Sequence, residues 1–154
     1  MNGQIELYED DPAMIDLLLC YLYTRDYDTS NNGLDLLVTH VHIYAIADKC
    51  GVSILKALAE HKICSALKGD WGLDISDFVA AIKLIYTINL ASDRGLRDCI
   101  QDTLLKYVPL LRESKDFVKL IKSGRGDGDV AIDVIIMVIG LPNRGIVYDD
   151  YYDA

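Results

Sequence analysis

Histidines are the side chains of this sequence best suited to chemistry, and their spacing argues against a shared metal site. His40 and His42 stand two residues apart in a helical pattern, about 200° apart around a helix axis, so they do not face one metal ion. His61 has Glu60 beside it, but no second ligand follows at helical spacing. The sequence contains no nucleophile elbow, zinc-protease motif or phosphate-binding glycine loop with its lysine. We therefore expect no metal, no cofactor, no catalytic residue and a protein that is not an enzyme.

The four cysteines are widely spaced, and none forms a Cys-x-x-Cys pair. They are Cys20, Cys50, Cys64 and Cys99. Most lie within apolar helical patterns, which is typical of small buried thiols. No basic start followed by an apolar run marks a secretory signal at the N-terminus. We therefore predict reduced cysteines and a cytoplasmic or nuclear protein.

The 154-residue chain carries a net charge of −9, most of it at the two ends. Residues 1–28 have a net charge of −6 and residues 127–154 one of −5, whereas the residues between them have +2. Without a basic stripe we expect no nucleic-acid partner, because contacts to phosphate dominate that affinity. Acidic ends are better suited to solubility or to a basic protein partner.

The strongest apolar run, Val130–Leu141, is too short to predict a membrane protein. It contains Asp133, and a transmembrane helix needs about 20 apolar residues. We therefore expect no membrane partner and a buried segment here. Its β-branched residues leave a strand as the competing interpretation, although its length favours a helix.

The element that must organise the chain is a helix within Pro12–Tyr27. Asp11 suits the N-cap and Pro12 the first turn, and the helix should end near Thr24. One apolar face is formed at helical spacing by Met14, Leu17, Leu18, Tyr21 and Leu22. A second stripe beside it is formed by Ile15, Leu19 and Tyr23. A helix apolar over most of its circumference needs cover on more than one side.

The same periodicity predicts five further helices in the rest of the chain. They cover residues 34–49, 53–67, 75–88, 93–108 and a short stretch around 117–121. We expect Gly51 to end the first of these, Ser53 to cap the next, and the two to form an αα-hairpin. Pro109 should stop the helix over 93–108, and Ser114 should cap the short one. Ile5–Tyr8 predicts a short strand, and Arg25–Asp28 either an edge strand or extended chain.

Several segments in the first half of the chain resemble the C-terminal half of a BTB/POZ domain, most closely its fungal form. They are Ile5-Glu-Leu, Glu9-Asp-Asp-Pro-Ala, Leu18–Tyr27, Val41–Lys49, Gly51-Val and Leu55–Ala59, and together they span about residues 5 to 67. Arg25 stands where many members have glycine, and Cys50 where an aromatic residue is frequent. The later helices resemble, more loosely, the helical extension that often follows such domains.

The resemblance implies a mainly α fold: a partial BTB/POZ region with at most a short strand remnant, followed by a helical-hairpin extension. We divide the chain into the shortened BTB/POZ-like region 1–67, the helical extension 68–141, and an acidic tail 142–154 that we expect to be mobile. A full domain of this family begins with roughly another half-domain. That half carries the main dimer surface and a loop that helps to bind cullins.

The function that the resemblance implies is that of a protein-interaction module, an adaptor or assembly piece linked to a cullin-type ubiquitin ligase. The alternative is a truncated fragment or gene-model product without independent function. The family comparison places any adaptor surface near the end of the first helix and the turn between the second and third. The residues of that surface are Tyr23, Arg25, Asp26, Tyr27, Lys49 and Ser53.

The excess apolar surface of the first helix predicts a second contact. We expect Leu18 and Leu22 to lie on a face left uncovered by the missing half-domain. This face would contact Val130–Leu141 or another subunit, since large apolar patches usually mark interfaces. Charged substitutions at Leu18 and Leu22 should then unfold or disperse the protein.

Overall fold

All regular structure in the described part of the chain is helical. The structure is a computed structural model, and it describes residues 11–29, 37–69, 74–88 and 94–123. Its helices are α1 (Pro12–Thr24), α2 (Leu37–Lys49), α3 (Ser53–Lys68), α4 (Ile75–Ile88), α5 (Gly95–Leu111) and α6 (Lys115–Ser123). The predicted mainly α class is confirmed. Predictions for Ile5–Tyr8, Val130–Leu141 and the tail 142–154 lie outside the described residues.

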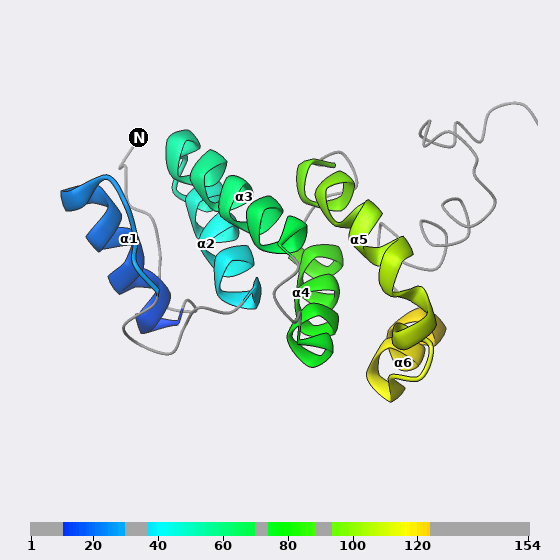
Figure 1. The fold of residues 1–154 in the computed structure, drawn as a ribbon. Coiled ribbons are helices and arrows are strands. Elements are labelled where there is room, and N and C mark those ends of the chain that lie inside the picture. The colour runs from blue at the N-terminus through cyan, green and yellow to red at the C-terminus, as the bar shows by residue number, and fades with distance from the viewer. Residues whose placement is uncertain (1–10, 30–36, 70–73, 89–93, 124–154) are drawn as a thin grey trace, which may run out of the picture.

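The helices form an elongated row, with α1 at one edge and α6 at the other (Figure 1). α2 and α3 pack as the predicted αα-hairpin, and α2 also contacts α1 and α4. α5 packs against α3 and α4, and α6 contacts α4. Because α2 and α4 occupy the middle of the row, they are buried on several sides, whereas α1 keeps an outer face.

The start and end of α1 follow from its sequence. Asp11 is the N-cap, and its carboxylate accepts a hydrogen bond of 2.9 Å from the Ala13 N–H. Arg25 ends the helix in the left-handed conformation, with φ of 63°, and its N–H donates to the Tyr21 carbonyl oxygen. This conformation lets the chain turn back along the helix. Residues 25–29 then run as irregular chain and not as an edge strand.

The predicted limits of the later helices are close, with two differences. Gly51 ends α2 with φ of +70°, as expected, but α3 begins at Ser53 itself and has no side-chain cap. Pro109 lies inside α5 and does not stop it. The helix continues because Leu111, in its last turn, is fully buried in the core. The Ser114 cap of α6 is confirmed by a 3.4 Å hydrogen bond from the Phe117 N–H.

Asp77 of α4 caps the start of α2. Its carboxylate accepts hydrogen bonds from the N–H groups of Leu37 (2.8 Å) and Val38 (3.2 Å). The first N–H groups of a helix have no partner within it, and a carboxylate also interacts favourably with the helix dipole. Asp77 therefore fixes the start of α2 against α4.

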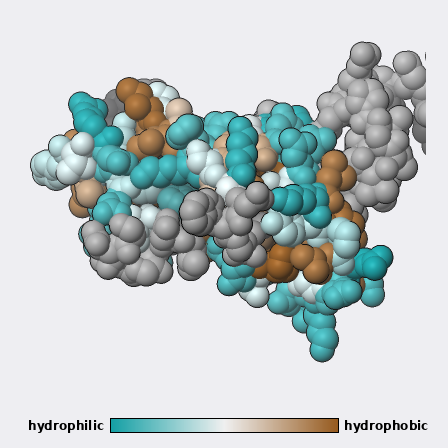
Figure 2. Space-filling view, in the orientation of Figure 1, coloured by the Kyte–Doolittle hydropathy of each residue, from teal (hydrophilic) through white to brown (hydrophobic). Residues whose placement is uncertain are grey.

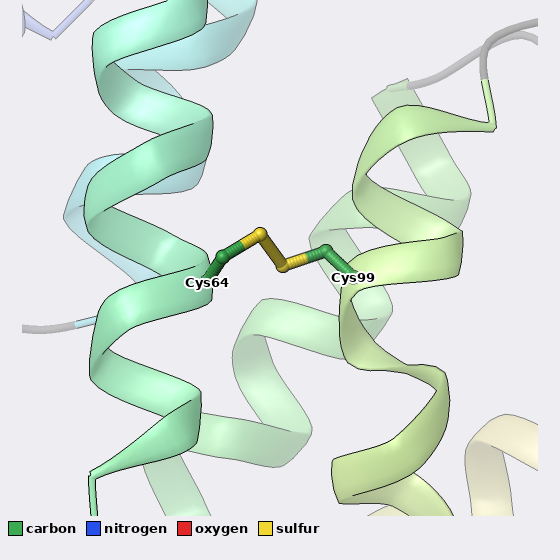
Figure 3. The surroundings of a disulfide bond; sticks show 2 residues. All are labelled: Cys64 and Cys99. Carbon is green, nitrogen blue, oxygen red and sulfur yellow. A yellow bond between two sulfur atoms is a disulfide. The ribbon is translucent and has the colours of Figure 1, made fainter.

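Cys64 of α3 and Cys99 of α5 form a disulfide, with their Cα atoms 5.7 Å apart (Figure 3). The prediction that all four cysteines are reduced is wrong for this pair. The two residues are 35 positions apart, and only the packing of α3 against α5 brings them together. Cys20 and Cys50 remain thiols.

Among the described residues, no helix is both long and apolar enough to cross a membrane.

Candidate partner-binding surface

An exposed apolar stripe lies on the outer face of α1. It consists of Leu19, Leu22 and Tyr23, which are 45%, 49% and 88% exposed. The three positions follow the i, i+3, i+4 spacing of one helix face. We call them the α1 stripe. Two leucines and a tyrosine this exposed on one face make an apolar patch, which is typical of an interaction surface.

Leu18 does not belong to this surface. The inner face of α1 buries Met14, Leu17, Leu18 and Tyr21 in the hydrophobic core, and Leu18 is only 5% exposed. The expectation that Leu18 lies on an uncovered face is therefore wrong, whereas Leu22 is exposed as expected. Leu18 and Leu22 lie one turn apart, but the inner face of the helix ends between them.

The chain leaving α1 is anchored by Tyr27, which is fully buried. Its hydroxyl lies 2.9 Å from Nδ1 of His40 in α2, and burial raises the pKa of the phenol above its ordinary value. The Lys62 ammonium group of α3 lies 4.1 Å above the Tyr27 ring and donates to its carbonyl oxygen at 2.7 Å. A partner cannot reach the buried Tyr27 side chain. Tyr27 therefore has a structural role, and its prediction as a partner-binding residue is wrong.

Asp26 is exposed but held in place. Its carboxylate lies 2.9 Å from the Lys62 ammonium group and accepts a 2.8 Å hydrogen bond from the Tyr27 N–H. The hydrogen bond from Lys62, helped by the one from Tyr27, lowers the pKa of Asp26 below its usual value. Thr24 adds a further bond, since its hydroxyl accepts from the Asp26 N–H at 3.3 Å. The turn after α1 is therefore fixed, and Arg25 projects from it.

Lys49 is the last residue of α2 and Ser53 the first of α3, so they flank the turn between the two helices, and both are exposed. This turn and the end of α1 lie toward the same end of the molecule, at the upper left of Figure 1. Ile54, next to Ser53, is 69% exposed, and Figure 2 shows hydrophobic surface around the start of α3. Ile54 was not among the residues predicted from the sequence for this surface. The signal was present, because Ile54 falls outside the periodic buried positions of this helix.

Neither the cysteines nor the histidines of the described residues form a metal site. His40 is buried against Tyr27, whereas His42 is exposed on the other side of α2. No group of three or more histidine, cysteine, aspartate or glutamate side chains lies together within the described ranges. His40, His61 and Lys62 line a shallow hollow with a volume of about 410 Å³.

Comparisons of the chain with protein-family models, with curated proteins and with solved structures found no match in any of the three.

Proposed function

We propose that this chain is a non-enzymatic protein-interaction module of BTB/POZ type that binds a partner protein through the α1 stripe and Arg25. The observation that carries the proposal is the exposure of Leu19, Leu22 and Tyr23 on a helix whose other face is fully used by the core. Fully burying one large apolar side chain contributes about 1.5–3 kcal/mol. Covering this stripe would therefore supply a useful part of a binding energy.

The conformation of Arg25 supports the resemblance on which the family assignment rests. Residue 25 adopts φ of 63°, a region that glycine enters without strain and other residues enter at a cost. Many BTB/POZ proteins have glycine at the position that this resemblance aligns with Arg25. An exposed arginine here adds a charge and several hydrogen-bond donors beside the stripe.

We include Asp26, Lys49, Ser53 and Ile54 in the proposed surface, because the end of α1 and the turn between α2 and α3 lie toward the same end of the molecule (Figure 1). Asp26 is held by Lys62, so it presents a carboxylate in a fixed place beside Arg25. Interfaces of this kind combine an apolar centre with a polar rim. A cullin-type ligase component is the partner class that the family resemblance suggests, and the cytoplasm or nucleus is the compartment proposed.

The proposal is tested with affinity purification of the tagged full chain, followed by quantitative mass spectrometry. The test variant carries Leu22→Asp and Tyr23→Asp, and the matched control carries Leu105→Asp, since Leu105 of α5 is also exposed (40%). We expect at least one protein, a second copy of the chain included, to be retained by the wild type and the control and lost by the test variant. Equal recovery by all three chains would refute the proposed surface.

A further inference from the structure

A groove between α4 and α6 lies at the opposite end of the molecule from the α1 stripe. Its volume is about 410 Å³. Val79 and Ala80 of α4 and Leu120 of α6 supply its apolar lining, and Lys83 and Lys119 face it from the two helices. Figure 2 shows hydrophobic surface in the region where α4 approaches α6 in Figure 1. The groove thus combines an apolar base with two cationic groups.

α6 is amphipathic, with an apolar side packed toward the core and a side of exposed lysines. Phe117 is the α6 side chain that enters the core, while Leu120 is only half-buried. Lys115, Lys119 and Lys122 follow i, i+4, i+7 spacing, and all three are exposed. This is a locally basic helix in a chain of net charge −9. Asp116 also lines the groove, but two lysines face it against one carboxylate.

We propose that this groove binds the acidic, tyrosine-rich segment Tyr148–Asp153 of the same chain. The segment lies outside the described residues, and only its sequence enters here: three aspartates, three tyrosines and no basic residue. Its carboxylates complement Lys83 and Lys119, and tyrosine rings suit a base formed by Val79 and Leu120. Tyrosine buries a large apolar ring while its hydroxyl stays hydrated or hydrogen-bonded.

The covalent link favours this occupant over a separate peptide. Twenty-four residues separate Ser123, the end of α6, from Tyr148. A chain of that length reaches at most about 80 Å when extended, so reach does not limit the contact. Linkage replaces a bimolecular encounter with an effective concentration near millimolar. A segment with weak intrinsic affinity therefore occupies the groove and competes with any other acidic ligand. This inference is independent of the α1 stripe.

The test uses amide NMR spectra of the full chain with charges reversed on either side. One variant carries Lys83→Glu and Lys119→Glu, a second carries Asp149→Lys, Asp150→Lys and Asp153→Lys, and a third combines both sets. Lys83 and Lys119 are exposed, so the reversals should leave the fold intact. A control with Lys68→Glu and Lys106→Glu reverses two exposed lysines outside the groove.

We expect the tail reversal to shift the amide signals of Val79, Ala80 and Leu120, and the combined variant to return them toward wild-type positions. These shifts should largely vanish in 1 M salt, where the Debye length is only about 3 Å and the charges are screened. Combining the control substitutions Lys68→Glu and Lys106→Glu with the tail reversal should not return the groove signals toward their wild-type positions. Unchanged groove signals after tail reversal would overturn the proposal. So would shifts that grow with protein concentration, because they would show docking between copies instead of within one chain.

Discussion

The Tyr27 hydroxyl lies 2.9 Å from Nδ1 of His40, and this buried contact ties the chain leaving α1 to α2. Tyr27 follows a polar turn in sequence, yet it is as buried as any residue of the core. The exposed end of the α1 stripe and Arg25 are therefore held at a fixed angle to the helical hairpin α2–α3. A surface that binds a partner benefits from such support, because less freedom is lost on binding.

Tyr27→Phe should lower the free energy of unfolding by about 1–2 kcal/mol. The substitution keeps the ring but removes the hydroxyl, so the buried His40 loses a hydrogen bond. Urea denaturation followed by circular dichroism measures the change, and Tyr23→Phe is the matched control because Tyr23 is exposed. An equal, negligible change in both variants would mean that the Tyr27–His40 bond does not support the fold.

Lys62→Met should raise the pKa of Asp26 toward its ordinary value. The Lys62 hydrogen bond is the largest cause of the lowered pKa, and methionine keeps most of the aliphatic length without the charge. Because the folded-state pKa lies below the unfolded one, this interaction stabilises the fold above about pH 4. That stabilisation is lost as the pH falls through the lower, folded-state pKa.

Carboxyl-carbon NMR titration of the wild type and the Lys62→Met variant gives the Asp26 pKa directly. Lys68→Met, on the same helix but outside this contact, serves as the control and should leave the Asp26 pKa unchanged. Identical Asp26 titration curves in the wild type and Lys62→Met would contradict the ion pair.

Leu18→Ala and Leu22→Ala should differ sharply in stability. Leu18 lies in the core, so its truncation leaves a cavity and should cost about 2–5 kcal/mol. Leu22 is half exposed, so its truncation should cost less than about 1 kcal/mol. Thermal unfolding of the two single variants checks this order, and equal losses would place both leucines in one environment.

Reduction of the Cys64–Cys99 disulfide should lower the free energy of unfolding by about 4 kcal/mol. A bond that closes a loop of this length restricts the unfolded chain by that order in the chain-entropy model. Cys64→Ser with Cys99→Ser should reproduce the loss, while Cys20→Ser should not. Mass spectrometry after alkylation of the non-reduced protein should find two modified cysteines. Four modified cysteines in protein alkylated inside cells would show that Cys64 and Cys99 are reduced there, which is the state that reducing compartments favour.

Periodicity predicted the helices but not the contacts between distant residues. The limits of α1 and α4 and the capping roles of Asp11 and Ser114 follow from neighbouring residues, so the sequence reveals them. Asp77 caps a helix that starts 40 residues earlier, which no local pattern encodes. Pro109 was predicted to stop α5, but the burial of Leu111 outweighs its local cost.

For the candidate surface, too, the sequence predicted the local pattern but not the contacts between distant residues. Two apolar stripes on α1 are visible in the sequence, but which of them faces the core depends on the position of α2. Leu18 and Leu22 share a stripe by spacing and lie in different environments in the fold. Tyr27 looked like part of an exposed segment, because its partners His40 and Lys62 come from later helices.

The central claim is that a partner protein contacts the α1 stripe, and site-specific photo-crosslinking tests it most directly. A photoreactive phenylalanine derivative replaces Tyr23 in the full chain, and in a separate protein it replaces Leu105 as the control. After irradiation in cells, we predict a discrete crosslinked product from position 23, lost when Leu22→Asp is added, and none from position 105. No product from position 23, or the same products from both positions, would contradict the account.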